Sequence, residues 1–414
     1  MKQRIRENLN KPEQLEKLYL SNKSTFKQEF NGLYPEIQDQ PIAQFWNLRL
    51  NFEKGKISWG NLSEIFYLVL GSFLSWLYIR FPEFVPVQKD IFYLKNLGLF
   101  ITPSLIVYFA WRQKISLRDW FLICFAILFA FLFMYHLPNF PESKTTILAC
   151  IHLPLFLWTV LGYSFAGGHS NDYRKNLDFL KFTEDLSLIA GILSILGLCL
   201  AGLTSVLFSL IKIEVEFFLF EYVFLWGLVA VPLVGTHLLQ TNPDLIQKVT
   251  PIVTKLFTPI FFTILLIYFF AILTLAKNPY NDREFLLQFN LVLAIVMASI
   301  LISISTYSRN SISKMETVLL FSLSLLAILL NGIALSSIFL RILDWGISPN
   351  RIAVLIWNML FMSNLILVAF QFFQIFREKT NIQKIEKGIS RFLKVYSFWI
   401  MFVTFIFPIL FDFQ

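Results

Sequence analysis

Charged side chains are scarce in this chain. Asp, Glu, Lys and Arg make up 15% of its 414 residues, whereas 56% are hydrophobic and the mean hydropathy is +0.64. A water-soluble domain carries about 25% charged residues, so too few are present here to cover a soluble surface of this size. The composition argues against a soluble protein and favours an integral membrane protein.

Cysteine is almost absent. Cys124, Cys150 and Cys199 all lie within apolar stretches, and no C-x-x-C pair occurs. Isolated cysteines of this kind usually pack as small hydrophobic side chains, whereas zinc and redox sites need paired spacing. The sequence therefore predicts no disulfide framework, no metal site and no cofactor.

Histidine is equally rare, and its spacing has no metal-site pattern. His136, His152, His169 and His237 each lie near an end of an apolar stretch, and none belongs to an H-E-x-x-H, H-x-H or E-x-x-H signature. A two-histidine site would also need a carboxylate in a suitable geometry. We interpret the four as interfacial histidines bonded to backbone or water.

Enzyme signatures are missing as well. The chain contains no phosphate-binding loop, no dinucleotide-binding glycine pattern and no G-x-S-x-G nucleophile turn. The short turn at residues 167–170 is too small to bind phosphate. No catalytic residue is predicted, and an enzyme has no motif support.

Long apolar stretches are what the sequence does contain. About 20 residues span the ~30 Å hydrocarbon layer, and only helices and closed barrels satisfy their backbones in lipid. We predict an all-α fold, a polytopic membrane helix bundle of about 11 transmembrane helices, without a visible internal repeat or broken helix. The predicted spans are residues 65–79, 92–111, 120–135, 147–165, 186–211, 217–239, 257–275, 285–304, 318–340, 353–376 and 395–411.

Lys and Arg are unevenly distributed between alternate connections. With the N-terminus inside, the inner connections carry sixteen and the outer connections nine, and residues 377–394 form the densest inner cluster. Lys and Arg favour the cytoplasmic side. We therefore expect the N-terminus to lie inside and the C-terminus outside. The same distribution accounts for the net charge of +8 without a nucleic-acid partner.

The first sixty residues differ from the rest. They are polar, mixed in charge and without the apolar stretch of a signal peptide. Helical spacing of apolar residues predicts a cytoplasmic N-terminal helical segment, residues 1–60, interrupted between Gly32 and Pro35, ahead of a transmembrane domain, residues 61–414. Its apolar surface is too small for an independent core. We therefore expect these side chains to be buried against each other or against inner loops: Phe26, Phe30, Phe45 and Trp46.

A few polar side chains interrupt the predicted spans. Glu184, Asp185 and Glu221 lie near span ends, where they either serve function or follow the helix dipole and the headgroups. Six amides lie deeper. Interhelical hydrogen bonds, worth about 0.6 kcal/mol each in membranes, account for such amides without transport: Asn290, Asn331, Asn358, Asn364, Gln371 and Gln374.

A series of short stretches occurs in a characteristic order at residues 15–19, 45–50, 57–60, 92–96, 152–154, 177–181, 282–286, 288–290 and 344–351. Together they resemble a bacterial membrane family known as domain of unknown function 4153. The resemblance extends over nearly the whole chain, although Thr183-Glu184 stands where that family has Asn-Gly-Glu. It implies a polytopic protein of the bacterial inner membrane and brings no activity, substrate or catalytic residue.

Most of these polar stretches face outward in the expected orientation. Gly346 and Pro349 make the connection from Asp344 to Arg351 tight and stiff, and we expect at least one opposite-charge contact between it and the Asp282–Arg283 connection. Such a site would bind an anionic or zwitterionic headgroup or solute. We call this group the outer polar basin: Lys95, His152, Asp282, Arg283, Asp344 and Arg351.

Three classes of function stay open. The many spans and the basin favour a transporter or a protein that handles a lipid or solute. The N-terminal helices and the basic cluster at 377–394 favour a membrane sensor or assembly scaffold. An intramembrane enzyme is the third class. The expected partners are the lipid bilayer and an anionic or zwitterionic solute or lipid headgroup, and the sequence does not indicate an oligomeric state.

Overall fold

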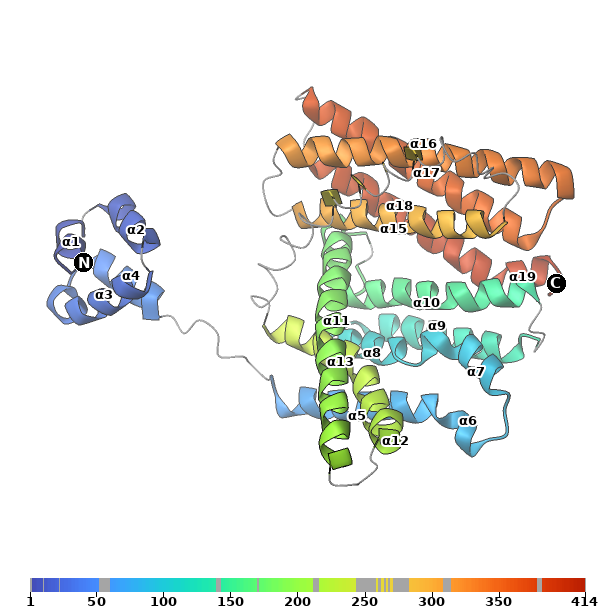
Figure 1. Ribbon diagram of the computed structural model, residues 1–414, viewed down its shortest axis with the longest axis horizontal. Helices are drawn as coiled ribbons and strands as arrows, with labels where there is room; N and C mark the ends of the chain where they lie inside the picture. The colour runs from blue at the N-terminus through green and yellow to red at the C-terminus, as the bar shows by residue number, and fades with distance from the viewer. Residues whose placement is uncertain are drawn as a thin grey trace. The chain divides into compact units, whose positions relative to one another are not determined.

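The computed structural model describes the chain as two compact units, Met1–Ser58 and Trp59–Gln414. The described part is helical and holds no strand (Figure 1). Most residues of the seventh predicted span, 257–275, lie outside it. The residues that the structure describes are 2–413, except 10, 22, 52–59, 139–142, 170, 211–215, 243–257, 260–261, 264–265, 267–268, 271–282, 308–313 and 378–381.

The N-terminal unit has a core of its own. Four helices, α1 (Lys2–Glu7), α2 (Pro12–Ser21), α3 (Lys23–Ile37) and α4 (Pro41–Asn51), surround it. Phe26 lies 5.1 Å from Trp46, ring centre to ring centre, and both are buried with Phe30. The prediction that this segment has too little apolar surface for a core was wrong, because its few aromatic rings pack on one another. Buried members of this core include Ile5, Leu15, Phe26, Phe30, Leu33 and Trp46.

Two details of the N-terminal unit differ from the predictions. Helix α3 continues through Gly32 and Pro35, because the proline lies in the last turn, where it interrupts few of the helical hydrogen bonds. Phe45 is 56% exposed, and Leu48, one turn further along α4, is 67% exposed. Phe45 was predicted to be buried, but the opposite face of α4, which carries Trp46, faces the core.

The larger unit is a helix bundle. After α5 (Leu62–Ile79) and a short α6 (Phe81–Phe84), the chain crosses back and forth in helices joined mostly by short turns. The others are α7 (Lys89–Asn96), η1 (Leu97–Leu99), α8 (Thr102–Arg112), α9 (Leu117–His136), α10 (Lys144–Phe165), α11 (Tyr173–Leu210), α12 (Glu216–Phe218), η2 (Leu219–Phe224), α13 (Leu225–Thr241), α15 (Arg283–Tyr307), α16 (Lys314–Trp345), α17 (Pro349–Phe376), α18 (Ile382–Phe405) and α19 (Phe407–Leu410).

Eight stretches of the described residues are long and apolar enough to cross a membrane. They correspond to predicted spans one to six, nine and ten. Helix α15, the eighth predicted span, contains a shorter apolar helix, Leu293–Ser305, and the last predicted span lies in α18 and α19. The apolar helices support a membrane-embedded protein, whereas the count of about 11 stays a prediction. The eight stretches are Leu62–Ile79, Lys89–Arg112, Leu117–His136, Lys144–Phe165, Tyr173–Gly202, Glu216–Thr241, Lys314–Trp345 and Pro349–Phe376.

Two of these stretches depart from a regular α-helix, which the sequence did not predict. Lys89–Arg112 is broken by a 3₁₀ turn at Leu97–Leu99, whereas Glu216–Thr241 continues unbroken through a π-helical turn at Leu219–Phe224. At the break, Gly98 lies so close to α10 that an added Cβ would be 2.9 Å from the Cα of Pro154. The break therefore lets two backbones approach each other closely.

Two apolar cores hold the bundle together. One is built around α8, α9 and α10 and includes Tyr108 and Phe109. The other lies between α15, α16, α17 and α18 and includes Phe372. Helix α11 contributes to both through its first turns, and in Figure 1 it runs across the direction of α10 and α16. It therefore joins the two halves of the bundle.

Candidate functional site

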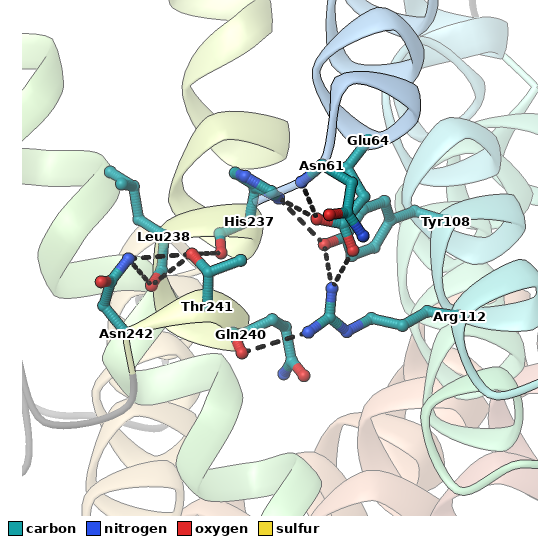
Figure 2. A network of polar contacts seen from close by, with 9 residues as sticks. All are labelled: Asn61, Glu64, Tyr108, Arg112, His237, Leu238, Gln240, Thr241 and Asn242. Atoms are coloured by element: carbon teal, nitrogen blue, oxygen red, sulfur yellow. Dashed lines mark hydrogen bonds and ion pairs between the residues drawn. The ribbon is translucent and has the colours of Figure 1, made fainter. Parts of the chain in front are cut away.

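Three membrane-length stretches meet at one end in a network of charged and polar side chains (Figure 2). Glu64 lies in the first turn of α5, Arg112 is the last residue of α8, and His237 lies in the last turn and a half of α13. The helix ends bring a carboxylate, a guanidinium and an imidazole together from segments that are far apart in the sequence. We call Glu64, Tyr108, Arg112 and His237 the ionic network.

The ionic network centres on an ion pair. Arg112 Nη1 lies 2.6 Å from Glu64 Oε1, with the side chains 27% and 13% exposed. The guanidinium also donates to the Tyr108 hydroxyl at 3.3 Å and, through Nη2, to the Gln240 carbonyl at 3.2 Å. Glu64 Oε2 accepts from the backbone N–H of Asn61 at 3.2 Å. Each charge is thus compensated, and the pair links α5, α8 and α13.

His237 adds a titratable group beside this pair. Its ring is 2% exposed, and its Nδ1 lies 3.3 Å from the Tyr108 hydroxyl and 3.9 Å from Glu64 Oε2. Since Tyr108 accepts from Arg112, its own proton is available for Nδ1 of a neutral His237. A protonated His237 would instead present an N–H at Nδ1, with Glu64 as the nearby carboxylate.

Gly60 makes room for the network. Its φ is +72°, a conformation that residues with a Cβ rarely adopt. A Cβ here would lie 2.3 Å from Glu64 Oε2 and 2.6 Å from His237 Cε1. The turn before α5 therefore needs glycine for two independent reasons, backbone conformation and space.

The arrangement permits an exchange of partners. Arg112 is the more exposed member of the pair, so an anionic group can reach its guanidinium from solvent. Glu64, released from Arg112, has a protonated His237 as its alternative cation. One bound anion and one bound proton leave the net charge of the site unchanged, so the exchange does not leave an uncompensated charge at the edge of the membrane.

The other end of α5 carries a second charged cluster. Arg80 lies 2.6 Å from Glu83, donates to the Glu221 carbonyl at 3.0 Å, and lies 4.2 Å from the ring centre of Tyr222. Arg80 lies sixteen positions after Glu64, which corresponds to about 24 Å along the helix at 1.5 Å per residue. That distance is comparable to the hydrocarbon layer, and aromatic rings such as that of Tyr222 favour its boundary.

Residues of the outer polar basin have other partners. Lys95, buried in the last turn of α7, donates to the carbonyl of Leu137. His152 accepts from Trp357 Nε1 at 3.0 Å and donates from Nδ1 to the Leu148 carbonyl at 2.8 Å, so its proton is on Nδ1. These bonds join α7 to the end of α9 and α10 to α17.

The remaining basin residues belong to two places in the sequence, the start of α15 and the turn between α16 and α17. Arg351 donates to the carbonyls of Trp345 and Gly346 at 2.8 and 2.7 Å, so it closes the turn between α16 and α17, near the exposed Asp344. Asp282 lies outside the described residues, as does the side chain of Arg283, where α15 begins. The expected contact between the two connections therefore stays a prediction.

The buried amides behave as packing groups. Asn358 donates to Asn290 Oδ1 at 2.7 Å, and Asn331 donates to the Asn358 carbonyl at 2.9 Å. Asn364 donates to the Tyr396 hydroxyl at 2.9 Å. These bonds join α15, α16, α17 and α18, which agrees with the interhelical role assigned to such amides.

Sequence reasoning missed most of the ionic network. His237 was noted as an interfacial histidine and Arg112 as an inner positive charge, while Glu64 and Tyr108 were not singled out. One signal was present, because Asn61-x-x-Glu64 has the spacing of a capping box at the start of an apolar helix. The proximity of α5, α8 and α13 depends on tertiary packing.

No group of three or more His, Cys, Asp or Glu side chains able to hold a metal occurs among the described residues. Comparisons of the chain with protein-family models, with curated proteins and with solved structures find no match.

Proposed function

We propose that this chain is an integral protein of the bacterial inner membrane that binds an anionic or zwitterionic lipid or solute for transfer across or along that membrane. The observation that carries the proposal is the partly exposed Glu64–Arg112 ion pair with His237 beside it, at the meeting point of three apolar helices. The broken membrane-length stretch Lys89–Arg112 gives further support, since discontinuous helices are typical of transporters.

Binding at the ionic network is coupled to a proton in this proposal. An anion takes Arg112 from Glu64, and Glu64 then pairs with protonated His237. Tyr108 from α8 and Glu64 from α5 face His237, and Arg112 donates to the same Tyr108 hydroxyl. Because a proton enters with the anion, acidic solution favours binding and alkaline solution opposes it.

Ligand-induced stabilisation tests the proposal with a defined probe. Short-chain phosphatidylglycerol carries one non-titrating negative charge, and its soluble headgroup, a glycerol phosphodiester, serves as the second arm. We expect the melting temperature of the purified protein to rise more with the probe at about pH 6 than at about pH 8, because acidic solution supplies the proton that enters with the anion. Stabilisation by the lipid alone identifies a lipid ligand, and stabilisation by both identifies the phosphodiester.

Arg112→Gln is the matched variant for this measurement. It removes the charge that receives the anion, so the pH-dependent stabilisation should vanish. Arg174→Gln, which removes an exposed arginine in the same unit, should leave it intact. Equal stabilisation of the wild type and Arg112→Gln would show that the anion binds elsewhere.

Orientation forms part of the proposal. The positive-residue distribution supports an inner N-terminus and an outer C-terminus, which places the ionic network at the cytoplasmic face and Arg80 at the periplasmic face. A reporter enzyme that works only in the periplasm should be active after Gln414 and after Arg80 and inactive after Gln113. Activity after Gln113 and none after Arg80 would reverse the orientation.

Family membership is also a proposal. The ordered series of polar stretches supports membership of the bacterial family called domain of unknown function 4153. Several stretches fall at helix boundaries of the described residues, such as 344–351 at the turn between α16 and α17. That family brings no activity to this chain.

A scaffold role is the second candidate. Phe45 and Leu48 lie one turn apart on α4 and are both largely exposed, on a unit that already has a packed core. Exposed apolar side chains of this size suit a partner-binding surface. Loss of a co-purifying protein on Phe45→Ser, with the N-terminal unit still folded, would favour this role.

A further inference from the structure

An apolar groove lies between α11 and α13, away from the polar contacts of the ionic network. It encloses about 330 Å³ and is open along one side. Its walls consist of apolar and small side chains, with the two hydroxyls of Ser194 and Thr204. The Thr204 hydroxyl donates to the Leu200 carbonyl at 2.7 Å, within its own helix. Lining residues include Leu193, Gly197, Ala201, Phe224, Gly227 and Val231.

The groove lies on the least buried membrane-length stretches. In the most apolar part of each stretch, 6% of the residues of Tyr173–Gly202 and 11% of those of Glu216–Thr241 are buried within the described unit. The corresponding share for α10 is 56%. The surroundings of such helices are hydrocarbon. A hollow left empty there would lose dispersion contacts on its open side, so an apolar occupant is favoured.

The size of the groove decides between two apolar occupants. Its α11 wall runs over residues 193–204, about 17 Å at 1.5 Å per residue. Helices α11 and α13 contact each other beside the groove, where an added Cβ at Gly235 would lie 2.8 Å from Ile189 Cγ2, so a helix about 10–12 Å across cannot enter between them. A helix of a second copy would rest on the rim and leave the hollow unfilled, whereas a single polymethylene chain can enter it.

We infer that this groove binds one acyl chain of a membrane phospholipid. The inference rests on the proposed function and deepens it, since it selects a lipid over a water-soluble solute. On α13 the groove begins at Leu219, beside the Glu221 carbonyl that Arg80 holds, and ends at Val234, one turn before His237. The groove thus occupies the stretch of α13 between the two charged clusters.

Photolabelling in vesicles tests the inference. The full-length protein is reconstituted into phosphatidylglycerol vesicles that contain a phospholipid with a diazirine in its acyl chain, and the adducts are mapped after irradiation. Helix α9 is the internal reference, because its Phe121, Phe125 and Leu128 are exposed apolar side chains outside the groove. We expect adducts on residues 193–204 and 219–234 to exceed those on α9.

Glycine substitutions supply the matched variants. A Cβ at Gly227, in the groove, or at Gly191, elsewhere on α11, would meet nothing within 4 Å, so leucine fits at either position and favours the helix. Gly227→Leu should reduce groove adducts to the α9 level, and Gly191→Leu should not. Ala201→Leu, from the opposite wall, provides a second way to fill the groove.

The outcomes separate the groove from the ionic network. The inference would be overturned if the groove were labelled no more strongly than α9, or if neither filling variant changed its labelling. The labelled lipids would then be ordinary boundary lipids. Crosslinking between two copies through the groove residues would also overturn the inference. Arg112→Gln should abolish pH-dependent headgroup binding while groove labelling persists, so either proposal can fail without the other.

Discussion

Arg112→Gln and Glu64→Gln are each expected to lower the free energy of unfolding by about 2–3 kcal/mol. Removing one partner of a buried ion pair costs roughly 3–5 kcal/mol, because the other charge is left uncompensated, and exposed pairs contribute about 0–1 kcal/mol. The Glu64 and Arg112 side chains, 13% and 27% exposed, fall between these cases. Reversible unfolding in mixed detergent micelles measures the change.

The double variant makes this prediction specific. Once both charges are gone, neither leaves the other unpaired, so Glu64→Gln with Arg112→Gln should destabilise by clearly less than the sum of the two single changes. Arg174→Gln, at an exposed position of the same unit, should have little effect. Additive single changes would mean that the two side chains do not depend on each other.

Gly60→Ala is expected to be strongly destabilising for so small a substitution. The left-handed backbone costs a residue with a Cβ about 1–2 kcal/mol, and here the new methyl would also overlap Glu64 Oε2 and His237 Cε1. The ion pair must shift to accommodate it. We expect a loss of about 2–4 kcal/mol in the unfolding experiment and loss of pH-dependent anion binding, since strained and overpacked sites each cost roughly this much.

Gly346→Ala isolates the two causes. Gly346 has nearly the same backbone conformation, with φ +74°, but a Cβ there would meet nothing within 4 Å. Its substitution should therefore cost the backbone strain alone and should leave anion binding unchanged. If the two alanine variants are equally stable, the contact of Gly60 with the ionic network is not tight.

The membrane character of the chain could be predicted because it is a property of local composition. Six of the eight membrane-length stretches are the first six predicted spans, and each could be recognised from its own residues. The break at Leu97–Leu99 and the π-helical turn at Leu219–Phe224 could not be predicted. The break depends on a neighbour distant in sequence, Pro154, whose backbone approaches Gly98 from another helix.

Polar residues were predicted less well, because their roles depend on partners distant in sequence. Arg351 carries a charge that indicated a basin, yet its guanidinium closes the turn that precedes its own helix. Glu64 resembles an ordinary helix-capping acid until α8 brings Arg112 within 2.6 Å. The core of the N-terminal unit was missed for a similar reason, since a count of apolar residues does not show how closely Phe26, Phe30 and Trp46 pack.

The central claim is that an anion and a proton enter the ionic network together. The most direct measurement is proton uptake on addition of short-chain phosphatidylglycerol to the weakly buffered wild-type protein, followed with a pH indicator near neutral pH. We predict net uptake of protons that saturates with the probe and disappears in His237→Gln. Binding of the probe without proton uptake, or with the same uptake in His237→Gln, would contradict the account.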